Sequence, residues 1–286
     1  MHITADWHIH SRNSCDEACL VVAELIADAP ALGIRAYGLT DHVHTPYNWP
    51  DLAASRAEFV ASTPPPQFHF GVEVSVVSQW ELDEIRKGGH SDPVYGLRAG
   101  GPPGAAPALG IDAETLARHK VEYVIGGTHW PLYVPLTRES VIRDYHRQNM
   151  FLATHPLITI IAHPWWWMGH WQDAQGHYPA EPWFDDFRRI PQSLHDEFAA
   201  AVTGHGKIVE INIGAILLNP LYPPAFADQY LEYLAALKSR QVRFSIGSDC
   251  HNARYGADFA RVAALLTAAG ITERDLWRLP ARTGEG

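Results

Sequence analysis

Short apolar segments alternate with amphipathic segments along most of this 286-residue chain. Several apolar runs are continuous, as in strands covered on both faces of a parallel sheet. The segments between them repeat apolar residues at helical spacing. We expect strands at residues 2–8, 36–40, 69–75, 121–128, 157–162, 207–212 and 243–247, and helices at residues 19–32, 140–153, 193–203, 229–238 and 257–269.

Two parallel α/β architectures fit this alternation. An open doubly wound sheet of the nucleotide-binding kind carries a glycine-rich turn after its first strand, and this chain has none there. A closed barrel instead gathers functional residues at the carboxyl ends of many strands. Because histidines and carboxylates follow nearly every expected strand, and about seven strands are expected, we predict a distorted seven-stranded, TIM-like α/β barrel.

The chain is long enough for one large α/β domain. Two segments depart from the alternation: residues 79–119 are rich in glycine and small residues, and residues 165–191 are rich in tryptophan. We interpret both as insertions into a single barrel domain spanning residues 1–286. A short helix is expected at residues 112–119 within the first insertion.

The formal net charge of −10, with 22 basic against 32 acidic residues, disfavours a nucleic-acid partner. No apolar run approaches the ~20 residues of a transmembrane helix, and no signal-peptide pattern precedes the first strand. Three cysteines, Cys15, Cys19 and Cys250, are too few and odd in number for a disulfide framework. We therefore expect a cytoplasmic protein without a membrane partner; the sequence specifies no oligomeric state.

The first expected strand ends in His8 and His10. Residues two apart in a strand point to the same side, so both imidazoles project together, about 7 Å apart by the strand rise. Such a pair suits two ligands of one metal ion. Two hydrogen-bonded surface histidines would give the same pattern, so the interpretation depends on the other strand ends.

Matching residues lie at or just after the end of every later strand, and the carboxyl ends of barrel strands meet at one rim. In chain order they are Asp41 and His42, Glu73, His129, His163, Glu210 and Asn212, and Asp249 and His251. Nitrogen and oxygen donors without thiolates suit Zn²⁺, Mn²⁺ or Fe²⁺. The set is too large for one ion, and a carboxylate such as Glu73 can bridge two. We expect a multinuclear metal site.

The motifs HIH, TDH, GVE, GTH, AHP and GSDCH occur in that order between residues 8 and 251. Each is short, but the ordered series on successive strands resembles the PHP (polymerase and histidinol phosphatase) family. The resemblance covers most of the chain. It implies a distorted seven-stranded barrel with a trinuclear metal centre, and hydrolysis of phosphoesters.

The resemblance also implies how the first two of three divalent ions are held. One ion takes four ligands and a second takes three, with Glu73 bridging them. The ligands of the first are His8, His10, Glu73 and Asp249, and those of the second are Glu73, His129 and His163.

The third ion would be held by His42, His251 and a residue of the loop after the first strand. Many relatives have a histidine at that loop position, and here it is Asp16. A carboxylate is an acceptable ligand of a divalent ion. Asp6 and Asp41 are expected to orient ligands from outside the metal shell. His44 lies outside the motifs and is a minor candidate for lining the pocket.

The implied reaction is attack on phosphorus by a hydroxide held between two metal ions. Glu73, Asp249 and His251 are the catalytic candidates among the ligands. A phosphomonoester dianion also needs a cationic group, and Arg254 is our first candidate, with Arg12 as an alternative. Either arginine is equally well explained as an exposed surface residue.

Tryptophans follow two of the candidate ligands: Trp130 follows His129, and Trp165–Trp167 come just after His163. They either pack the second insertion against the barrel or form an aromatic pocket for the substrate. The second interpretation favours a small organic phosphoester with an apolar group, including diesters and triesters.

Three other functions are compatible with parts of the pattern. Histidinol-phosphate phosphatase belongs to the same family, although the two insertions argue against that assignment. An amidohydrolase also begins with His-x-His on a barrel, but commonly adds a lysine on a central strand, which is not found near His129. A non-catalytic, metal-stabilised module is disfavoured because nearly the whole ligand set is present.

Overall fold

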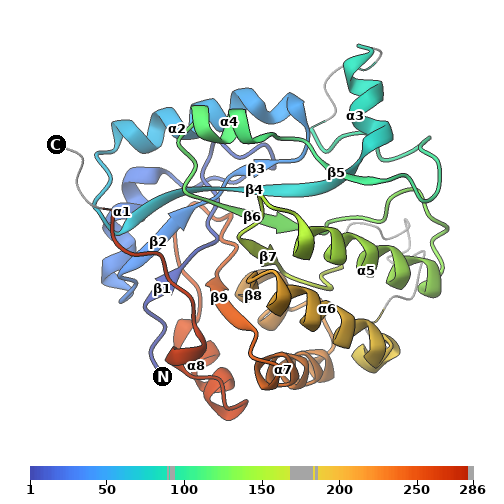
Figure 1. Cartoon of the computed structure of the whole chain (residues 1–286). Helices are drawn as coiled ribbons and strands as arrows, with labels where there is room; N and C mark the ends of the chain where they lie inside the picture. The colour runs from blue at the N-terminus through green and yellow to red at the C-terminus, as the bar shows by residue number, and fades with distance from the viewer. Residues whose placement is uncertain (89, 91–93, 168–182, 184–185, 283–286) are drawn as a thin grey trace.

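Seven parallel strands follow one another around a nearly closed barrel (Figure 1). The computed structural model describes residues 1–88, 90, 94–167, 183 and 186–282. The strand order is β1 (Ala5–Asp6), β2 (Ala36–Leu39), β4 (Phe68–Ser78), β6 (Tyr123–Gly127), β7 (Ile160–Ala162), β8 (Ile208–Asn212) and β9 (Arg243–Gly247). The predicted α/β, TIM-like barrel is confirmed.

The first and last strands approach each other and nearly close the barrel. The amide of Trp7 donates to the carbonyl of Ile246 at 2.8 Å, and an isolated parallel bridge joins Ile9 to Cys250. Two further strands lie off the main path. β3 (His42–Val43) follows β2 in the chain and pairs parallel with a later part of β4. β5 (Pro107–Leu109) pairs antiparallel with the end of β4.

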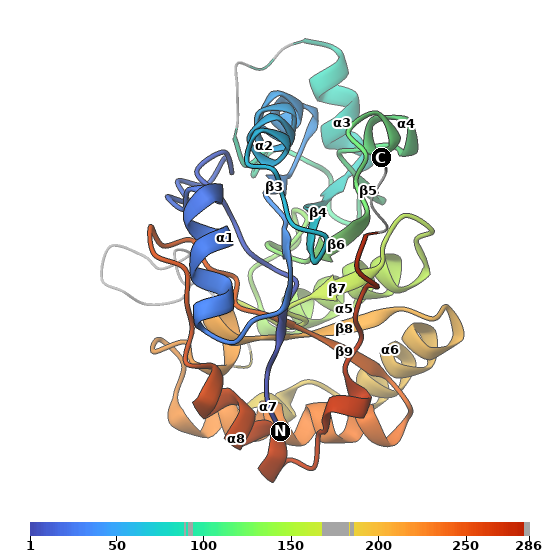
Figure 2. The same ribbon diagram turned by 90° about the vertical axis from the view of Figure 1, so that its left-hand side faces the viewer.

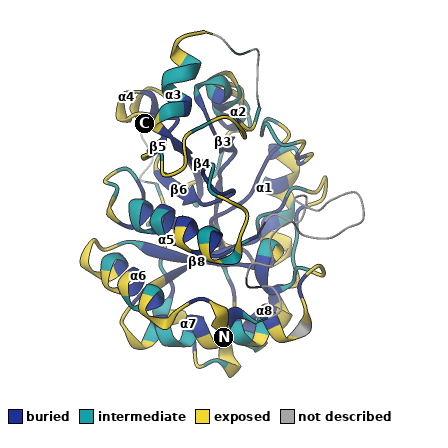
Figure 3. Ribbon diagram, turned by 90° about the vertical axis from the view of Figure 1, so that its right-hand side faces the viewer, coloured by how far each residue is buried: buried dark blue, intermediate teal, exposed yellow. Residues whose placement is uncertain are grey.

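Helices surround the barrel (Figure 2). Their exposed residues face outward and their buried residues face the strands (Figure 3). They are α1 (Val22–Ala31), α2 (Trp49–Ala61), α3 (Gln79–Arg86), α4 (Ala113–Arg118), α5 (Arg138–Thr154), α6 (Gln192–Gly204), α7 (Pro224–Ser239) and α8 (Phe259–Ala268). Short turns of 3-10 helix span Pro46–Asn48, Phe187–Arg189 and Glu273–Asp275, and a π-helix spans Ile213–Leu217. Among the described residues, no helix combines the length and apolarity needed to cross a bilayer.

Local residue types explain where two of the helices begin or end. Helix α1 buries Val22, Leu25 and Ala29, spaced along one face, and ends before Gly33, whose φ of 80° suits glycine. The side chain of Asp112 caps α4 by accepting from the amide of Thr115 at 2.7 Å. The short helix expected at 112–119 is therefore present, as α4.

The first predicted insertion contains more regular structure than expected, because it holds α3 and β5 as well as α4. The sequence interpretation also missed α2. That helix buries Leu52, Ser55 and Phe59, and a stripe that includes a serine gives a weak apolar period. Most of the second insertion, residues 168–182 and 184–185, lies outside the described residues. The single-domain interpretation stays a prediction.

Side chains along each strand alternate between the barrel interior and the helix layer. On β6, Tyr123 and Ile125 belong to a small cluster with residues of β1, β7 and β8, whereas Val124 packs in the large outer cluster. The hydroxyl of Tyr123 donates to the carbonyl of Trp7 at 2.8 Å. Because β6 and β1 are not neighbours, this side chain crosses the interior.

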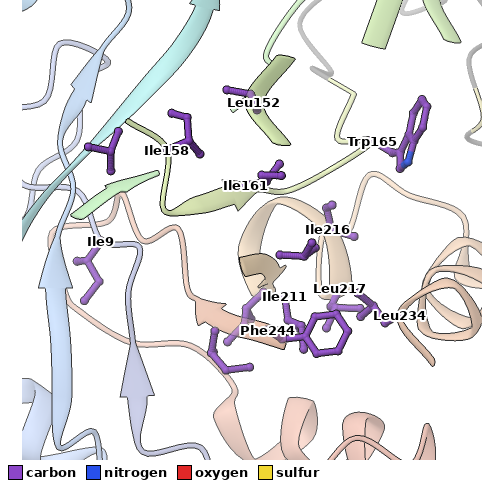
Figure 4. Close-up of a cluster of buried hydrophobic side chains, with 14 of the residues drawn as sticks. Ile9, Leu152, Ile158, Ile161, Trp165, Ile211, Ile216, Leu217, Leu234 and Phe244 are labelled. Carbon is purple, nitrogen blue, oxygen red and sulfur yellow. The ribbon is translucent and has the colours of Figure 1, made fainter. Parts of the chain in front are cut away.

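The outer layer joins the strands to the helices around them. Figure 4 shows Ile211 and Phe244, from β8 and β9, beside Leu217 of the π-helix and Leu234 of α7. All four side chains are buried. This apolar layer fixes the strands, so that the residues at their carboxyl ends are held on a rigid frame.

Candidate metal centre

Glu73 lies at the centre of the site. It is fully buried on β4, and its Oε2 lies 2.8 Å from His8 Nε2, 3.4 Å from His10 Nε2 and 3.1 Å from His42 Nδ1. Three imidazoles therefore converge on one carboxylate oxygen. Two come from the segment just after β1, and one comes from β3.

The second oxygen of Glu73 faces the opposite strands. Its Oε1 lies 3.2 Å from His129 Nε2 and 3.0 Å from His163 Nε2, which follow β6 and β7. Each oxygen thus faces a different set of imidazoles. This is the arrangement in which one carboxylate can bridge two metal ions.

Three groups of side chains offer ligand atoms within 4.8 Å of one another in the described part of the chain. They are His8, His10, Glu73 and Asp249; His42, Glu73 and His129; and His10, Asp16, His42 and His251. Eight of the nine predicted ligands belong to these groups. His163 belongs to none of them, although its Nε2 lies 3.0 Å from Glu73 Oε1. The allocation of ligands to particular ions differs in detail, because His10 and His42 each belong to two groups.

Asp16 reaches the site from the loop after β1. Its Oδ2 lies 2.5 Å from His251 Nε2 and 3.2 Å from His42 Nε2. The carboxylate thus lies beside the two histidines predicted to share an ion with it. That Asp16 serves as a metal ligand in place of a histidine stays a prediction.

Several ring nitrogens in the site have no hydrogen-bond partner. His10 Nε2, His42 Nδ1 and His129 Nε2 are buried and make no hydrogen bond, although each faces Glu73. A buried polar atom without a partner costs about 1–3 kcal/mol. A divalent ion would accept the lone pairs of these nitrogens while binding the carboxylate. The donor set therefore fits metal ions better than it fits a purely hydrogen-bonded cluster.

In several rings, the nitrogen that faces away from Glu73 or Asp16 has a hydrogen-bond partner of its own. His8 Nδ1 lies 2.6 Å from Glu210 Oε1, His129 Nδ1 lies 2.8 Å from Ser75 Oγ, and His251 Nδ1 lies 2.9 Å from the carbonyl of Asp249. Metal-binding histidines typically donate their second N–H to such partners, which fixes the tautomer.

Asp6 and Asp41, which belong to none of the three groups, accept hydrogen bonds from backbone amides and from hydroxyl groups. Asp6 accepts from the amides of His8 and Ser248 at 3.3 and 2.9 Å, and burial raises its pKa to about 6. Asp41 accepts from the amide and hydroxyl of Ser11 at 2.5 and 2.6 Å. Both carboxyls therefore brace the loops that carry ligands, in keeping with the orienting role expected from the sequence.

Two candidate ligands have left-handed backbone. The φ angle is 25° at His163 and 55° at Asp249. This conformation is costly for residues other than glycine, and it clusters at functional sites. At Asp249 the amide donates to the carbonyl of His8 at 2.8 Å, which helps to hold the turn.

The carboxylates and imidazoles of the site shift one another's pKa. Burial alone would raise the pKa of Glu73, but the imidazoles of His8, His42 and His129 hold it well below its usual range. Burial likewise opposes ionisation of Asp249, and His8 with other imidazoles holds its pKa low. Burial lowers the pKa of His129 to about 4. Near neutral pH both carboxylates are therefore ionised and His129 is neutral, whereas neighbouring carboxylates outweigh burial and raise the pKa of His8, His42 and His251. Metal binding would displace protons from those rings.

A cavity of about 350 Å³ opens onto these groups. Its lining combines candidate ligands with aromatic rings and with residues at the start of the π-helix. The lining residues that are not candidate ligands are His44, Tyr95, Trp130, Trp166, Gly214 and Ala215. Of the described residues, no lysine or arginine lines this cavity.

The two predicted arginines lie elsewhere on the surface. Arg254 is exposed and does not line the described cavity, so its catalytic role stays a prediction. The Nε of Arg12 lies 3.2 Å from Glu58. Sequence interpretation also missed Ser75, which lies two residues after Glu73 and therefore on the same face of β4. Tyr95, at the cavity edge, had no recognisable signal in the sequence.

Gly127 leaves open the space where three candidate ligands meet. A Cβ there would lie 2.5 Å from His129 Cε1, 2.9 Å from Glu73 Oε1 and 3.0 Å from His163 Cε1. We predict that Gly127→Ala displaces these side chains and weakens metal affinity by about 10–100-fold. Titration of metal-free protein with Zn²⁺ checks this. Gly204→Ala, where a Cβ meets nothing within 4 Å, is the matched control; equal affinities in the two folded variants would contradict the prediction.

No family model matches the sequence, and no curated protein matches it. In structure the chain is similar to a candidate histidinol phosphatase, HisK, of Listeria monocytogenes, with a TM-score of 0.56 and 13% identity over 90% of this chain and 99% of that chain. An Agrobacterium tumefaciens protein gives a TM-score of 0.44 at 10% identity, over 96% and 90% of the two chains. A Xaa-Pro dipeptidase with bound methionine gives 0.38 at 9% identity, over 94% and 60%. The similarity to the Listeria structure extends over nearly the whole of both chains and is a similarity of fold.

Proposed function

We propose that this protein is a metal-dependent hydrolase that cleaves phosphoester bonds of small organic substrates. The observation that carries the proposal is the shared carboxylate of Glu73, whose two oxygens face separate sets of buried imidazoles beside a cavity. Purely structural metal sites are closed, whereas catalytic sites keep access for a substrate. This site has that access.

Three divalent ions, of zinc, manganese or iron, suit a donor set of imidazoles and carboxylates. When bound, such ions lower the pKa of water and neutralise charge on phosphoryl oxygens. The chain's own contribution is to fix the spacing and direction of its ligands. Glu210 holds His8, and Ser75 holds His129, so these rings need little reorganisation when substrate binds.

The cavity walls favour an ester with an apolar or aromatic group. Tyr95, Trp130 and Trp166 supply ring surface, and no described lysine or arginine is available there for a phosphomonoester dianion. Burying such a dianion without added cations is costly. Diesters and triesters carry less charge and fit these walls better.

Histidinol phosphate is a second candidate substrate. The Listeria protein of similar fold is described as a candidate histidinol phosphatase. Histidinol phosphate is a polar monoester, so it would depend on the metal ions themselves for charge neutralisation. This alternative and the aromatic-ester proposal make opposite predictions for the same assay.

We predict that protein reconstituted with Mn²⁺, Zn²⁺ or Fe²⁺ hydrolyses aryl phosphodiesters faster than histidinol phosphate, and binds at least two ions per chain. Turnover of a phosphoester panel and metal analysis measure these quantities, with chelator-treated protein as the control. Activity confined to polar monoesters would contradict the substrate proposal. Fewer than two ions in folded protein would contradict the metal hydrolase itself, and full metal loading without turnover would indicate a non-catalytic module.

A further inference from the structure

His44 has a buried ring nitrogen whose role the metal groups do not explain. The residue follows β3, is buried, and lines the cavity. Its Nε2 makes no hydrogen bond within the described residues, whereas its Nδ1 lies 2.6 Å from Ser75 Oγ. A buried nitrogen without a partner costs free energy, and a ligand in the cavity that His44 lines would supply that partner.

A short chain of hydrogen bonds connects this ring to a candidate metal ligand. Ser75 Oγ lies between His44 Nδ1, at 2.6 Å, and His129 Nδ1, at 2.8 Å. If His129 gives the lone pair of Nε2 to a metal ion, its hydrogen is on Nδ1 and is donated to Ser75. The serine has one hydrogen of its own, and it then donates to His44 Nδ1.

This chain decides which nitrogen of His44 carries hydrogen. Because Nδ1 accepts from Ser75, the hydrogen of the neutral ring must be on Nε2. A cationic ring carries hydrogen on both nitrogens, so Nε2 is a donor in that state as well. Metal binding at His129 therefore sets a fixed donor at the cavity wall.

The location of His44 indicates which oxygen it meets. Its ring centroid lies 4.7 Å from that of the candidate ligand His42, and also 5.3 Å from that of Trp130 and 5.4 Å from that of Tyr95. A substrate with its phosphoryl group on the ions and its organic group against the aromatic rings places the linking oxygen at this boundary.

We propose that His44 Nε2 donates a hydrogen bond to the oxygen that links the phosphoryl group to the organic group, and so stabilises charge on that oxygen as the bond breaks. The inference rests on the proposed function. A well-placed donor of this kind contributes about 10²–10³-fold to turnover. Ser75 is a positioning residue, since it acts only through the two rings.

The tautomers can be measured without any reaction. Long-range proton–nitrogen correlation spectra of the wild-type protein loaded with Zn²⁺ are expected to show hydrogen on Nε2 of His44 and on Nδ1 of His129. Hydrogen on Nδ1 alone in His44 would overturn the inference.

A pair of amide substitutions tests the role in turnover. Glutamine places its NH₂ near the Nε2 position of histidine, and asparagine reaches only the Nδ1 position. With aryl phosphodiesters, His44→Asn is expected to lose about 10²–10³-fold, with larger losses for more basic leaving groups. His44→Gln should stay within about tenfold of the wild type, and both should bind as much Zn²⁺ as the wild type.

Two outcomes separate this inference from the function on which it rests. Equal turnover by His44→Asn, His44→Gln and the wild type, or losses independent of the leaving group, would overturn the role of His44 alone. If metal-loaded wild-type protein hydrolyses none of the diesters, the proposed function fails and the inference fails with it.

Discussion

Glu73→Gln is expected to reduce metal-dependent hydrolysis by about 1,000-fold or more. The carboxylate contacts five imidazoles through two oxygens, and it is the only group shared between the clusters around His8 and around His129 in the described structure. Glutamine has nearly the same shape but no charge. Its NH₂ end cannot bind a cation, so at least one set of imidazoles loses its bridging ligand.

Metal analysis and steady-state turnover of purified Glu73→Gln measure this loss. Two other glutamate-to-glutamine variants serve as an intermediate case and as a control for this loss. Glu210→Gln weakens the support of His8 Nδ1 and should reduce metal affinity by about 10–100-fold. Glu114→Gln changes an exposed residue of α4 that pairs with Arg118, and should behave as the wild type. Full metal content and turnover in Glu73→Gln would show that this residue is not the shared ligand.

The positions of the candidate ligands at the strand ends were predictable because they depend on local order. Period-two alternation puts Tyr123, Ile125 and Gly127 on one face of β6, and His129 follows in the same series. The same rule, applied beyond Glu73, would have found Ser75. A parallel barrel then brings all such strand ends to one rim, so nine ligands could be expected from strand order and the family resemblance.

The cavity walls depend on contacts that no local pattern reveals. Tyr95 belongs to a glycine-rich segment, and the chain there is anchored by Asn48 Nδ2 donating to the carbonyl of Val94 at 3.3 Å. Nearby, the guanidinium of Arg98 lies 3.7 Å from the ring centre of Trp130. These partners are separated by tens of residues and come from different elements. Their pairing is a property of the assembled fold, which periodicity and spacing do not encode.

The barrel interior gives the second large effect: Tyr123→Ala is expected to lower the free energy of unfolding by about 3–5 kcal/mol. The side chain is 2% exposed and fills the space beside two glycines on neighbouring strands. A Cβ at Gly38 would lie 1.7 Å from its hydroxyl oxygen, and one at Gly71 would lie 2.6 Å from its Cζ. Removing the ring leaves a cavity that the strands cannot close without moving.

Tyr123→Phe separates the ring from its hydroxyl. This substitution keeps the ring packing but removes the hydroxyl that donates to the carbonyl of Trp7 at 2.8 Å. It should therefore lower the free energy of unfolding by about 1–3 kcal/mol. Urea unfolding of both variants and the wild type, with metal removed, gives the comparison. Since Tyr123 does not line the cavity, both folded variants should bind Zn²⁺ normally. If Tyr123→Ala is no less stable than Tyr123→Phe, the ring is not what fills and braces the barrel interior.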